Sequence, residues 1–216
     1  MASDVQLVIF DLGRVLIRIC NNYREACKLA GVCLPDDLAP FDAETAARDH
    51  QAIVLLDTGQ IDLDEFAHRV APHRHITPRE VIRAYDVFLL EPYAGALELI
   101  DQLNRDGLKT ACLSNTSGGH WRQMCDPSHR SFFPIDRMTW QFASHLVGAC
   151  KPSDAIYQHV ERASGFSGQQ ILFFDDLEEN VNAATRRGWR AHQIRLDSDP
   201  IAQARAHLRE YGILRN

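Results

Sequence analysis

Residues 7–10 (LVIF) form an apolar run that ends abruptly on a carboxylate, Asp11, with Gly13 two residues later. Such a run predicts a buried strand. An unpaired carboxylate at the end of a buried strand costs several kcal/mol to remove from water. Asp11 therefore needs a partner such as a cation or a lysine, and we predict that it is a nucleophile beside a divalent metal ion.

Residues 22–90 have the periodicity and the start signals of helices, and we expect no strand among them. For example, Thr77 precedes a proline at the first helical position and Glu80 follows three residues later. The helix predicted there carries apolar residues through Phe88 and Leu89. Because this helical block directly follows the first strand, we interpret it as an inserted cap rather than a separate domain.

From Pro92 onward, short apolar strands alternate with helices. After the first strand, we expect strands at residues 108–113, 137–142, 171–174 and 191–194. Alternation of this kind predicts a parallel sheet with right-handed crossovers. The sequence thus predicts an α/β fold in which residues 1–20 and 91–216 form the core and residues 21–90 form a small inserted α-helical cap.

Charge and hydropathy exclude several classes of partner. The net charge of −6 over 216 residues argues against nucleic acid or an anionic membrane as the main partner. No apolar run approaches the length of about 18 residues that crosses a bilayer, and the start of the chain lacks a secretory signal pattern. We expect a cytoplasmic protein, while its oligomeric state stays open. The six cysteines contain no C-x-x-C pair, which argues against a zinc site.

Polar residues follow several of the predicted strands, and the carboxyl ends of parallel strands meet at one edge of a sheet. They are three carboxylates, a hydroxyl, an amide and an ammonium group: Asp11, Asp175, Asp176, Ser114, Asn115 and Lys151. Converging carboxylates repel one another unless a hard cation lies among them, and oxygen ligands in this number suit Mg²⁺. The set therefore predicts a magnesium site formed by the three aspartates.

A phosphate group is expected beside this metal ion. Lys151, Ser114 and Asn115 would hold its oxygens, and the backbone N–H groups of Leu12 and Gly13 would complete a small anion nest. Asp11 would attack phosphorus in line, form an aspartyl phosphate, and be released by water in a second step. Asp11 and Lys151 are thus the predicted catalytic residues.

The same residues also have structural interpretations that the sequence leaves open. Asp175 or Asp176 would serve equally as the N-cap of the following helix, and Ser114 or Asn115 as the cap of a helix near residues 118–119. Asn180 is either exposed or an orienting group that hydrogen-bonds Lys151 or a metal-bound water.

Four motifs, FDLGRV, LSNT, CKP and FFDDLEEN, occur in this order, each at the end of its expected strand. Together they resemble the four motifs of the haloacid dehalogenase-like hydrolase superfamily. Within it, the chain is most similar to small sugar-phosphate phosphatases and to the N-terminal phosphatase-like domain of epoxide hydrolases. The resemblance implies a Rossmann-like parallel sheet with helices on both faces and a cap. It also implies Mg²⁺ and hydrolysis of a small phosphorylated metabolite, such as glucose 1-phosphate.

One position departs from that pattern. Most phosphatases of the superfamily carry a second aspartate two residues after the nucleophile, where this chain has Gly13. The resemblance implies that only the backbone carbonyl of this residue binds the metal, so Gly13 is expected to remain a ligand. The general acid is lost, and such an acid typically contributes a factor of about 10²–10⁴. Hydrolysis would then need a good leaving group, such as an anomeric phosphate, or a proton from water or from a cap residue, for which His120 and His50 are candidates. For Arg14, a place at the surface is favoured over one at the mouth of the cap, where it would add positive charge.

Two other functions compete with a phosphatase. A haloacid dehalogenase uses the same nucleophile on carbon without a metal, but the pair Asp175 and Asp176 would repel a carboxylate substrate. A non-catalytic member that binds a phosphorylated ligand or a protein partner is the other alternative, and Gly13 keeps it open.

Overall fold

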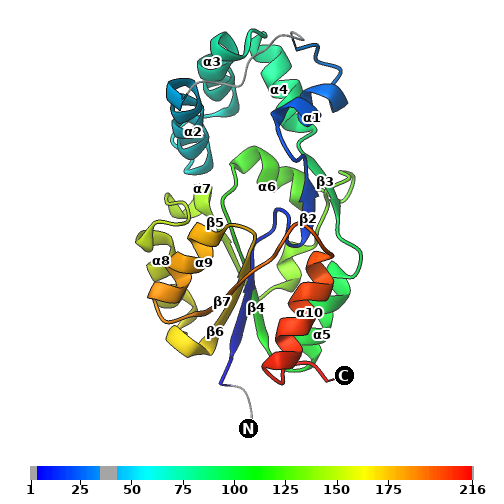
Figure 1. Cartoon of the computed structure of the whole chain (residues 1–216), viewed down its shortest axis with the longest axis vertical. Coiled ribbons are helices and arrows are strands. Elements are labelled where there is room, and N and C mark those ends of the chain that lie inside the picture. Colours follow the sequence, from blue (N-terminus) through cyan, green and yellow to red (C-terminus); the bar gives the residue numbers. More distant parts are fainter. Residues whose placement is uncertain (1–3, 35–42, 216) are drawn as a thin grey trace.

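The computed structural model describes residues 4–34 and 43–215, so residues 1–3 and 35–42 of the predicted core and cap lie outside the described residues. A five-stranded sheet with the strand order β5-β4-β1-β6-β7 forms its centre (Figure 1), and all its neighbouring strands are parallel. The strands are β1 (Leu7–Phe10), β4 (Lys109–Ser114), β5 (Trp140–Ala143), β6 (Ile171–Asp175) and β7 (Arg190–Gln193). The predicted α/β class is confirmed.

Helices cover both faces of this sheet (Figure 1). They are α5 (Ala96–Arg105), α6 (Gly118–Cys125), α7 (Ser144–Val147), α8 (Asp154–Ser164), α9 (Glu178–Arg186) and α10 (Pro200–Glu210), with 3₁₀ turns at Ile135–Arg137 and Gly168–Gln170. Strand β1 is buried along its whole length, as its apolar run predicts. Leu7 and Ile9 pack in the apolar cluster that includes α8 and α9, whereas Val8 and Phe10 pack in the cluster that includes α5 and α10.

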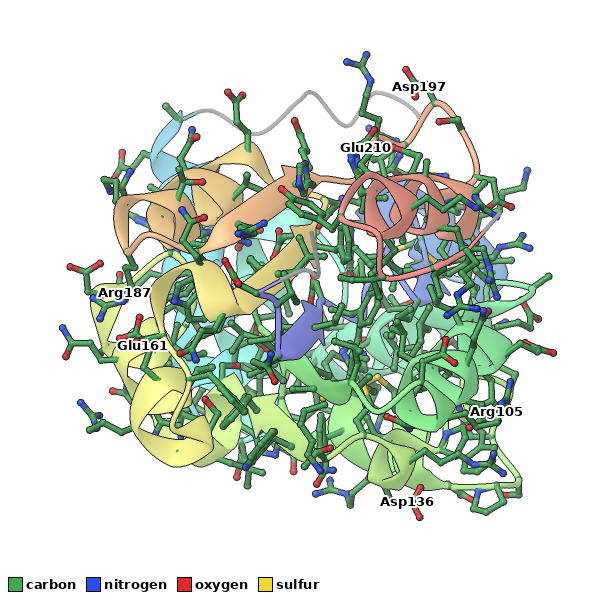
Figure 2. The ribbon with its side chains drawn as sticks, turned by 90° about the horizontal axis from the view of Figure 1, so that it is seen from below. Arg105, Asp136, Glu161, Arg187, Asp197 and Glu210 are labelled. Atoms are coloured by element: carbon green, nitrogen blue, oxygen red, sulfur yellow. The ribbon has the colours of Figure 1, made fainter. Side chains whose placement is uncertain are left out.

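The Glu161 carboxylate on α8 binds two residues that follow α9, Arg187 and Trp189. Arg187 donates from Nε and Nη2 to Glu161 at 3.1 and 2.5 Å, and the indole of Trp189 donates to the same side chain at 2.8 Å. Figure 2 shows Glu161 and Arg187 next to each other at the outer edge of the molecule. This bidentate contact holds the C-terminal end of α9 against α8.

The remaining helices are α1 (Tyr23–Leu29), α2 (Ala43–Asp57), α3 (Leu63–Arg74) and α4 (Pro78–Asp86). They gather at the end of the sheet opposite the N-terminus (Figure 1). Helices α2, α3 and α4 enclose their own apolar cluster. The predicted start of α4 is confirmed, because Thr77 Oγ1 accepts from Glu80 N at 3.3 Å while Glu80 Oε2 accepts from Thr77 N at 2.8 Å.

Two short antiparallel strands, β2 (Ile17–Ile19) and β3 (Leu89–Pro92), carry the chain into and out of these four helices. The predicted cap boundaries at residues 21 and 90 fall at this two-stranded ribbon, and the division into two domains stays a prediction. Within residues 4–34 and 43–215, no helix has both the length and the apolar character that a membrane span requires.

The structure corrects two expected elements. Strand β3 begins at Leu89, so the expectation of no strand within residues 22–90 is wrong, and α4 ends at Asp86. Pairing with β2 satisfies the backbone groups that a longer α4 would have bonded within itself. Strand β5 begins at Trp140 rather than at residue 137, because the residues that follow Pro134 form a 3₁₀ turn.

Candidate active site

The carboxyl ends of β1 and β6 bring three aspartates together. Phe10 pairs with Phe174 in the parallel ladder, and Asp11 N donates to Phe174 O at 2.8 Å. Asp11 therefore lies directly beside the end of β6, where Asp175 and Asp176 follow. One carboxylate oxygen from each of these aspartates lies within 4.8 Å of the other two. The sequence-based expectation that these strand ends converge agrees with this geometry.

Lys151 connects two of these carboxylates. Its side chain is 1 % exposed, and Nζ donates to Asp175 Oδ2 at 2.6 Å and to Leu113 O at 2.8 Å, with Asp11 Oδ1 at 3.1 Å. These three acceptors match the three N–H donors of an ammonium group. Burial opposes the charged form, but the charges of Asp11 and Asp175 outweigh burial and raise the pKa of Lys151. The lysine is therefore a permanent cation within the site.

Asp175 is fully buried and fully bonded. Its Oδ1 accepts from Leu177 N and from Asn180 Nδ2, both at 2.9 Å, while its Oδ2 accepts from Lys151. Asn180 is buried, which rules out the exposed position that the sequence left open, and its Nδ2 bonds to the Asp175 carboxylate rather than to Lys151. The reason is local, since the chain after Asp175 turns back and places the first turn of α9 over this carboxylate.

Asp11 keeps one oxygen uncommitted. Its Oδ1 accepts from Leu12 N at 2.7 Å and faces Lys151, whereas no hydrogen bond from the described residues reaches its Oδ2. Burial raises the pKa of Asp11 to about 7; Lys151 opposes this shift, and Asp175 and Asp176 add to it. One lysine is therefore insufficient to hold Asp11 ionised, and a further positive charge would do so.

Asp176 lies beside Arg14, which the sequence placed at the surface. Arg14 Nη1 lies 3.5 Å from Asp176 Oδ2, with the two side chains 25 % and 8 % exposed. The turn that follows Asp11 directs Arg14 here, because Arg14 adopts a left-handed φ of 58° and its N donates to Ile17 O at 2.7 Å. The pKa of Asp176 is raised by burial and by Asp175, and lowered by Arg14.

Asn115 holds the backbone of Lys151. Its Nδ2 donates to Lys151 O at 2.9 Å, and its Oδ1 accepts from Lys151 N at 2.8 Å. The side-chain amide therefore positions the lysine, which differs from the direct phosphate contact that the sequence suggested. Ser114 is buried at the same edge and lines the cavity described below. Ser117, rather than Ser114 or Asn115, is the N-cap of α6.

Gly13 occupies a position where a side chain would fit. A Cβ built there would meet only the side chain of Ile19, at 3.6 Å, which is an ordinary contact, and the backbone of Gly13 is not left-handed. The missing second aspartate is therefore a change of chemistry, not one that the backbone or the packing requires.

The donor set at this edge fits a hard divalent cation. Three carboxylates face two cationic side chains, Lys151 and Arg14, so the buried cluster carries excess negative charge. Asp11 and Asp176 retain oxygens that Lys151 does not occupy, and Gly13, two residues after Asp11, has a backbone carbonyl to offer. Oxygen ligands alone suit Mg²⁺. Asp175, whose oxygens already accept three hydrogen bonds, fits a supporting role better than that of the direct ligand expected from the sequence.

A cavity of about 360 Å³ lies between this edge and helices α1–α4. Leu12, Gly13, Ser114 and Asn115 line its core end, and most of the remaining lining is apolar. Its size is within the range of small-molecule sites. The position of the cavity over the catalytic edge makes it the place where the rest of a substrate would lie.

Neither histidine considered as a proton donor is placed for that role. His120 Nε2 donates to Tyr85 O at 3.0 Å, its ring stacks on Tyr85 with centroids 3.8 Å apart, and burial lowers its pKa to about 4. Near neutral pH its other ring nitrogen therefore carries no proton. His50 is exposed on α2 and does not line the cavity.

Sequence reasoning missed Asp57 and favoured a surface position for Arg14. Asp57 is the last residue of α2, lines the cavity and is partly buried. A carboxylate at a helix C-terminus is disfavoured by the helix dipole, and this placement is the signal that the sequence offered. Arg14 gave no comparable signal, since its position depends on the turn after Asp11.

The doubly covered parallel sheet, the inserted helices and the aspartate–lysine cluster define a class of hydrolase. The chain belongs to the haloacid dehalogenase-like hydrolase family, because the sequence model of that family matches residues 5–188. It is 29% identical over 118 residues to phosphatase MT3486 of Mycobacterium tuberculosis, across 53% of this chain and 52% of that protein. The match thus spans about half the length of this relative.

Two further similarities cover more of the chain. The sesquiterpene phosphatase astK of Aspergillus oryzae is 24% identical over 155 residues, which is 68% of this chain and 77% of that protein. The HAD family enzyme bt-2542 of Bacteroides thetaiotaomicron, solved as a complex with magnesium and inorganic phosphate, superposes with a TM-score of 0.70 at 22% identity, covering 90% of this chain and 96% of that one. At this identity the structural likeness concerns the fold alone.

Proposed function

We propose that this hydrolase is a Mg²⁺-dependent phosphatase that acts on a small phosphorylated metabolite through an aspartyl phosphate. The observation that carries the proposal is the buried cluster in which Lys151 bridges Asp11 and Asp175 while Asp11 Oδ2 stays uncommitted. A fixed carboxylate with one free oxygen, beside a permanent cation and under a cavity, is suited to nucleophilic attack on an anionic phosphate.

The proposed reaction has two steps. Asp11 Oδ2 attacks phosphorus, the bond between phosphorus and the ester oxygen breaks, and that oxygen leaves with a proton as an alcohol. Water then attacks the aspartyl phosphate, and Asp11 and inorganic phosphate are released. Lys151 and the N–H of Leu12 hold Asp11 Oδ1 throughout. Ser114 and the backbone N–H groups of Leu12 and Gly13 would bind the phosphate oxygens.

Asp176, the carbonyl of Gly13 and the Asp11 oxygen that does not attack phosphorus would hold the magnesium ion. When bound, the ion neutralises charge on the phosphate and on the carboxylates around it. Asp175 supports this arrangement from behind, because it fixes Lys151 and bonds to Asn180 and Leu177 N. The proposal is consistent with the phosphatase relatives and with the magnesium and phosphate in the complex of bt-2542.

Turnover of p-nitrophenyl phosphate and glucose 1-phosphate tests the proposal. We expect activity with Mg²⁺, none after EDTA, and loss in Asp11→Asn. Asp106→Asn, which changes an exposed carboxylate at the end of α5, is the matched control and should retain activity. Trapping of a phosphorylated Asp11 by mass spectrometry would identify the intermediate directly.

The same assays separate the alternatives. Turnover of a 2-haloacid in EDTA would identify a dehalogenase instead. Binding of phosphate without turnover of any ester would identify a non-catalytic phosphate-binding protein. Glucose 1-phosphate represents the sugar phosphates that the sequence resemblance suggested. Comparing its kcat/KM with those of other phosphate esters tests whether a sugar phosphate is the preferred substrate.

A further inference from the structure

The lining of the cavity is apolar on both sides. Ile17 and Ile19 line it from the ribbon beside the catalytic edge, while Ile53, Phe66 and Phe88 line it from the helical block. Ile53 remains 39% exposed although it faces this space, as expected for an apolar side chain that awaits a contact. The wall above the phosphate site thus offers hydrocarbon surface.

Several polar side chains in the lining are already bonded to the protein, whereas the buried hydroxyl of Tyr23 has no hydrogen-bond partner among the described residues. Arg74 pairs with Asp49 at 2.9 Å. The hydroxyl of Tyr85 bonds to Ser117 and accepts from His120 N, and His120 Nε2 donates to Tyr85 O. Arg74, Tyr85 and His120 would have to give up these bonds to pair with the hydroxyl groups of a sugar. The Tyr23 hydroxyl and the Asp57 carboxylate are too few for all of them, and burying an unpaired polar group is unfavourable.

We propose that the substrate is the phosphate monoester of an apolar aliphatic alcohol, with its hydrocarbon part in this cavity. The inference rests on the phosphatase function proposed above and specifies its substrate class. The supporting observation is that one cavity runs from the catalytic edge to the helical block. Leu12 and Ser114 line its end at the catalytic edge, and Ile53 and Phe66 line it from the helical block. An ester held by its phosphate at the catalytic edge would extend its chain into apolar surroundings.

A series of straight-chain alkyl phosphates tests this inference, assayed below the concentrations at which the longer esters form micelles. We expect kcat/KM to rise about fourfold for each added methylene until the cavity is full. Ile53→Ser should flatten the dependence on chain length. Leu29→Ser, a change of an exposed leucine on α1 outside the cavity, should leave it unchanged.

The outcomes of this series distinguish the two levels of the proposal. If p-nitrophenyl phosphate is hydrolysed but kcat/KM does not depend on chain length, or glucose 1-phosphate is the better substrate, the apolar class is wrong and the phosphatase stands. If no phosphate ester is hydrolysed, both are wrong.

A separate observation concerns the proton that the leaving alcohol needs. Asp57 lines the same cavity as Gly13, and no hydrogen bond or ion pair from the described residues reaches its carboxylate. The end of α2 lies against the core here, since a Cβ on Gly59 would come within 3.1 Å of His145 O. Burial alone raises the pKa of Asp57 to about 7. After burial, the charge of Asp57 is the largest influence raising the pKa of Cys150, the neighbour of Lys151.

We infer that Asp57 is the general acid that takes the place of the missing second aspartate at Gly13. Its carboxyl group gives a proton to the ester oxygen as the bond to phosphorus breaks. The resulting carboxylate regains a proton from the water that attacks the aspartyl phosphate, so the cycle is balanced. The unpaired carboxyl group of Asp57 is free to transfer its proton. His120 is not, because its Nε2–H is bonded to Tyr85 O.

Leaving-group dependence tests this role. Asp57→Asn should lower kcat for octyl phosphate by about 10²–10⁴, and should change kcat for p-nitrophenyl phosphate, whose leaving group needs no proton, by less than about threefold. Adding Gly13→Asp should restore much of the loss, since a side chain fits there. Asp64→Asn, at an exposed position of α3, is the control. Asp57→Ser serves if the asparagine variant does not fold.

Two results would overturn the role of Asp57. An equal loss for both esters would assign it to folding or binding, and unchanged kcat for octyl phosphate would show that another group supplies the proton.

Discussion

A buried cation lies on each side of the cavity, Lys151 in the core and Arg74 in the helical block. The side chains are 1 % and 8 % exposed, and each pairs with a buried carboxylate. Lys151 also reaches Asp11 and the end of β4. Arg74 instead pairs with Asp49 and covers the ring of Tyr23 at 3.7 Å.

The difference separates the two tasks of the molecule. In the core, Lys151 and the aspartates surround one free oxygen of Asp11 with charge. All three N–H groups of the lysine are taken up by Asp11, Asp175 and Leu113 O. The helical block neutralises its own buried charge through Arg74 and Asp49 and presents hydrocarbon to the cavity. The nucleophile and the charges around it thus lie on one side, and most of the apolar lining lies on the other, together with the inferred proton donor Asp57. Removal of the buried cation should therefore have different effects on the two sides.

The largest effect is expected from Lys151→Met. Removing this cation leaves Asp11 and Asp175 buried without a partner, which should reduce the free energy of unfolding by about 3–5 kcal/mol. It should also lower kcat for p-nitrophenyl phosphate by about 10²–10³. Urea denaturation and steady-state kinetics measure both. Lys109→Met, at the exposed start of β4, should change neither; equal behaviour of the two variants would contradict the bridging role of Lys151.

Arg74→Met should be similarly destabilising but chemically mild. Leaving Asp49 unpaired should reduce the free energy of unfolding by about 3 kcal/mol, the lower end of the range for buried pairs. The kcat for p-nitrophenyl phosphate should change less than about threefold, since Arg74 does not contact the aspartate cluster. The double variant with Lys151→Met should show additive stability losses. A loss of kcat comparable to that of Lys151→Met would contradict the prediction that Arg74 stabilises the fold without taking part in catalysis.

Magnesium should stabilise the core alone. At about 100 times its dissociation constant, Mg²⁺ should raise the free energy of unfolding by about 2.7 kcal/mol. Thermal unfolding with Mg²⁺ and with EDTA measures this shift. Asp176→Asn should abolish it, whereas Asp49→Asn should preserve it on a less stable background. Retention of the full shift in Asp176→Asn would exclude that residue as a ligand.

The smallest effect is a pH-dependent gain of stability in Asp57→Asn. Burial raises the pKa of Asp57 from 3.8 to about 7, so the folded protein keeps a proton that the unfolded chain has released. Wild-type stability should therefore fall as pH rises from about 4 to about 7. Asparagine does not titrate, and the variant should be more stable above pH 7 by about 1 kcal/mol, discounted because Asp57 is partly exposed.

Unfolding in EDTA at pH 4.5 and pH 8 measures this difference. A gain of the same size at both pH values would mean that the Asp57 carboxylate carries no burial cost in the folded state. Asp64→Asn should show no gain at either pH.

The sequence was sufficient for those parts of the site that depend on strand order. Asp11 and Asp175 each end an apolar run, and parallel strands place such ends at one edge whatever the connecting helices do. The start of α4 at Thr77 was equally local, because its capping box needs only residues three apart.

The remainder depends on contacts between distant segments. The direction of Arg14 is set by a left-handed backbone angle that its sequence does not require. The strand at Leu89 forms only because β2 lies beside it. Asp57 lines the cavity only because the end of α2 packs against the core. The rest of the lining likewise combines residues from the ribbon, the helical block and the sheet edge. No local pattern encodes such packing.

The β2–β3 ribbon carries both covalent connections between the sheet and helices α1–α4 (Figure 1). Asp11 precedes this ribbon and Asp57 lies beyond it, so the nucleophile and the inferred proton donor are carried by two parts of the chain that only this ribbon joins covalently. An ester that fills the cavity contacts both parts at once, so its hydrocarbon would help to hold the ester oxygen between Asp11 and Asp57. Chain length should then affect the rate of proton transfer as well as affinity.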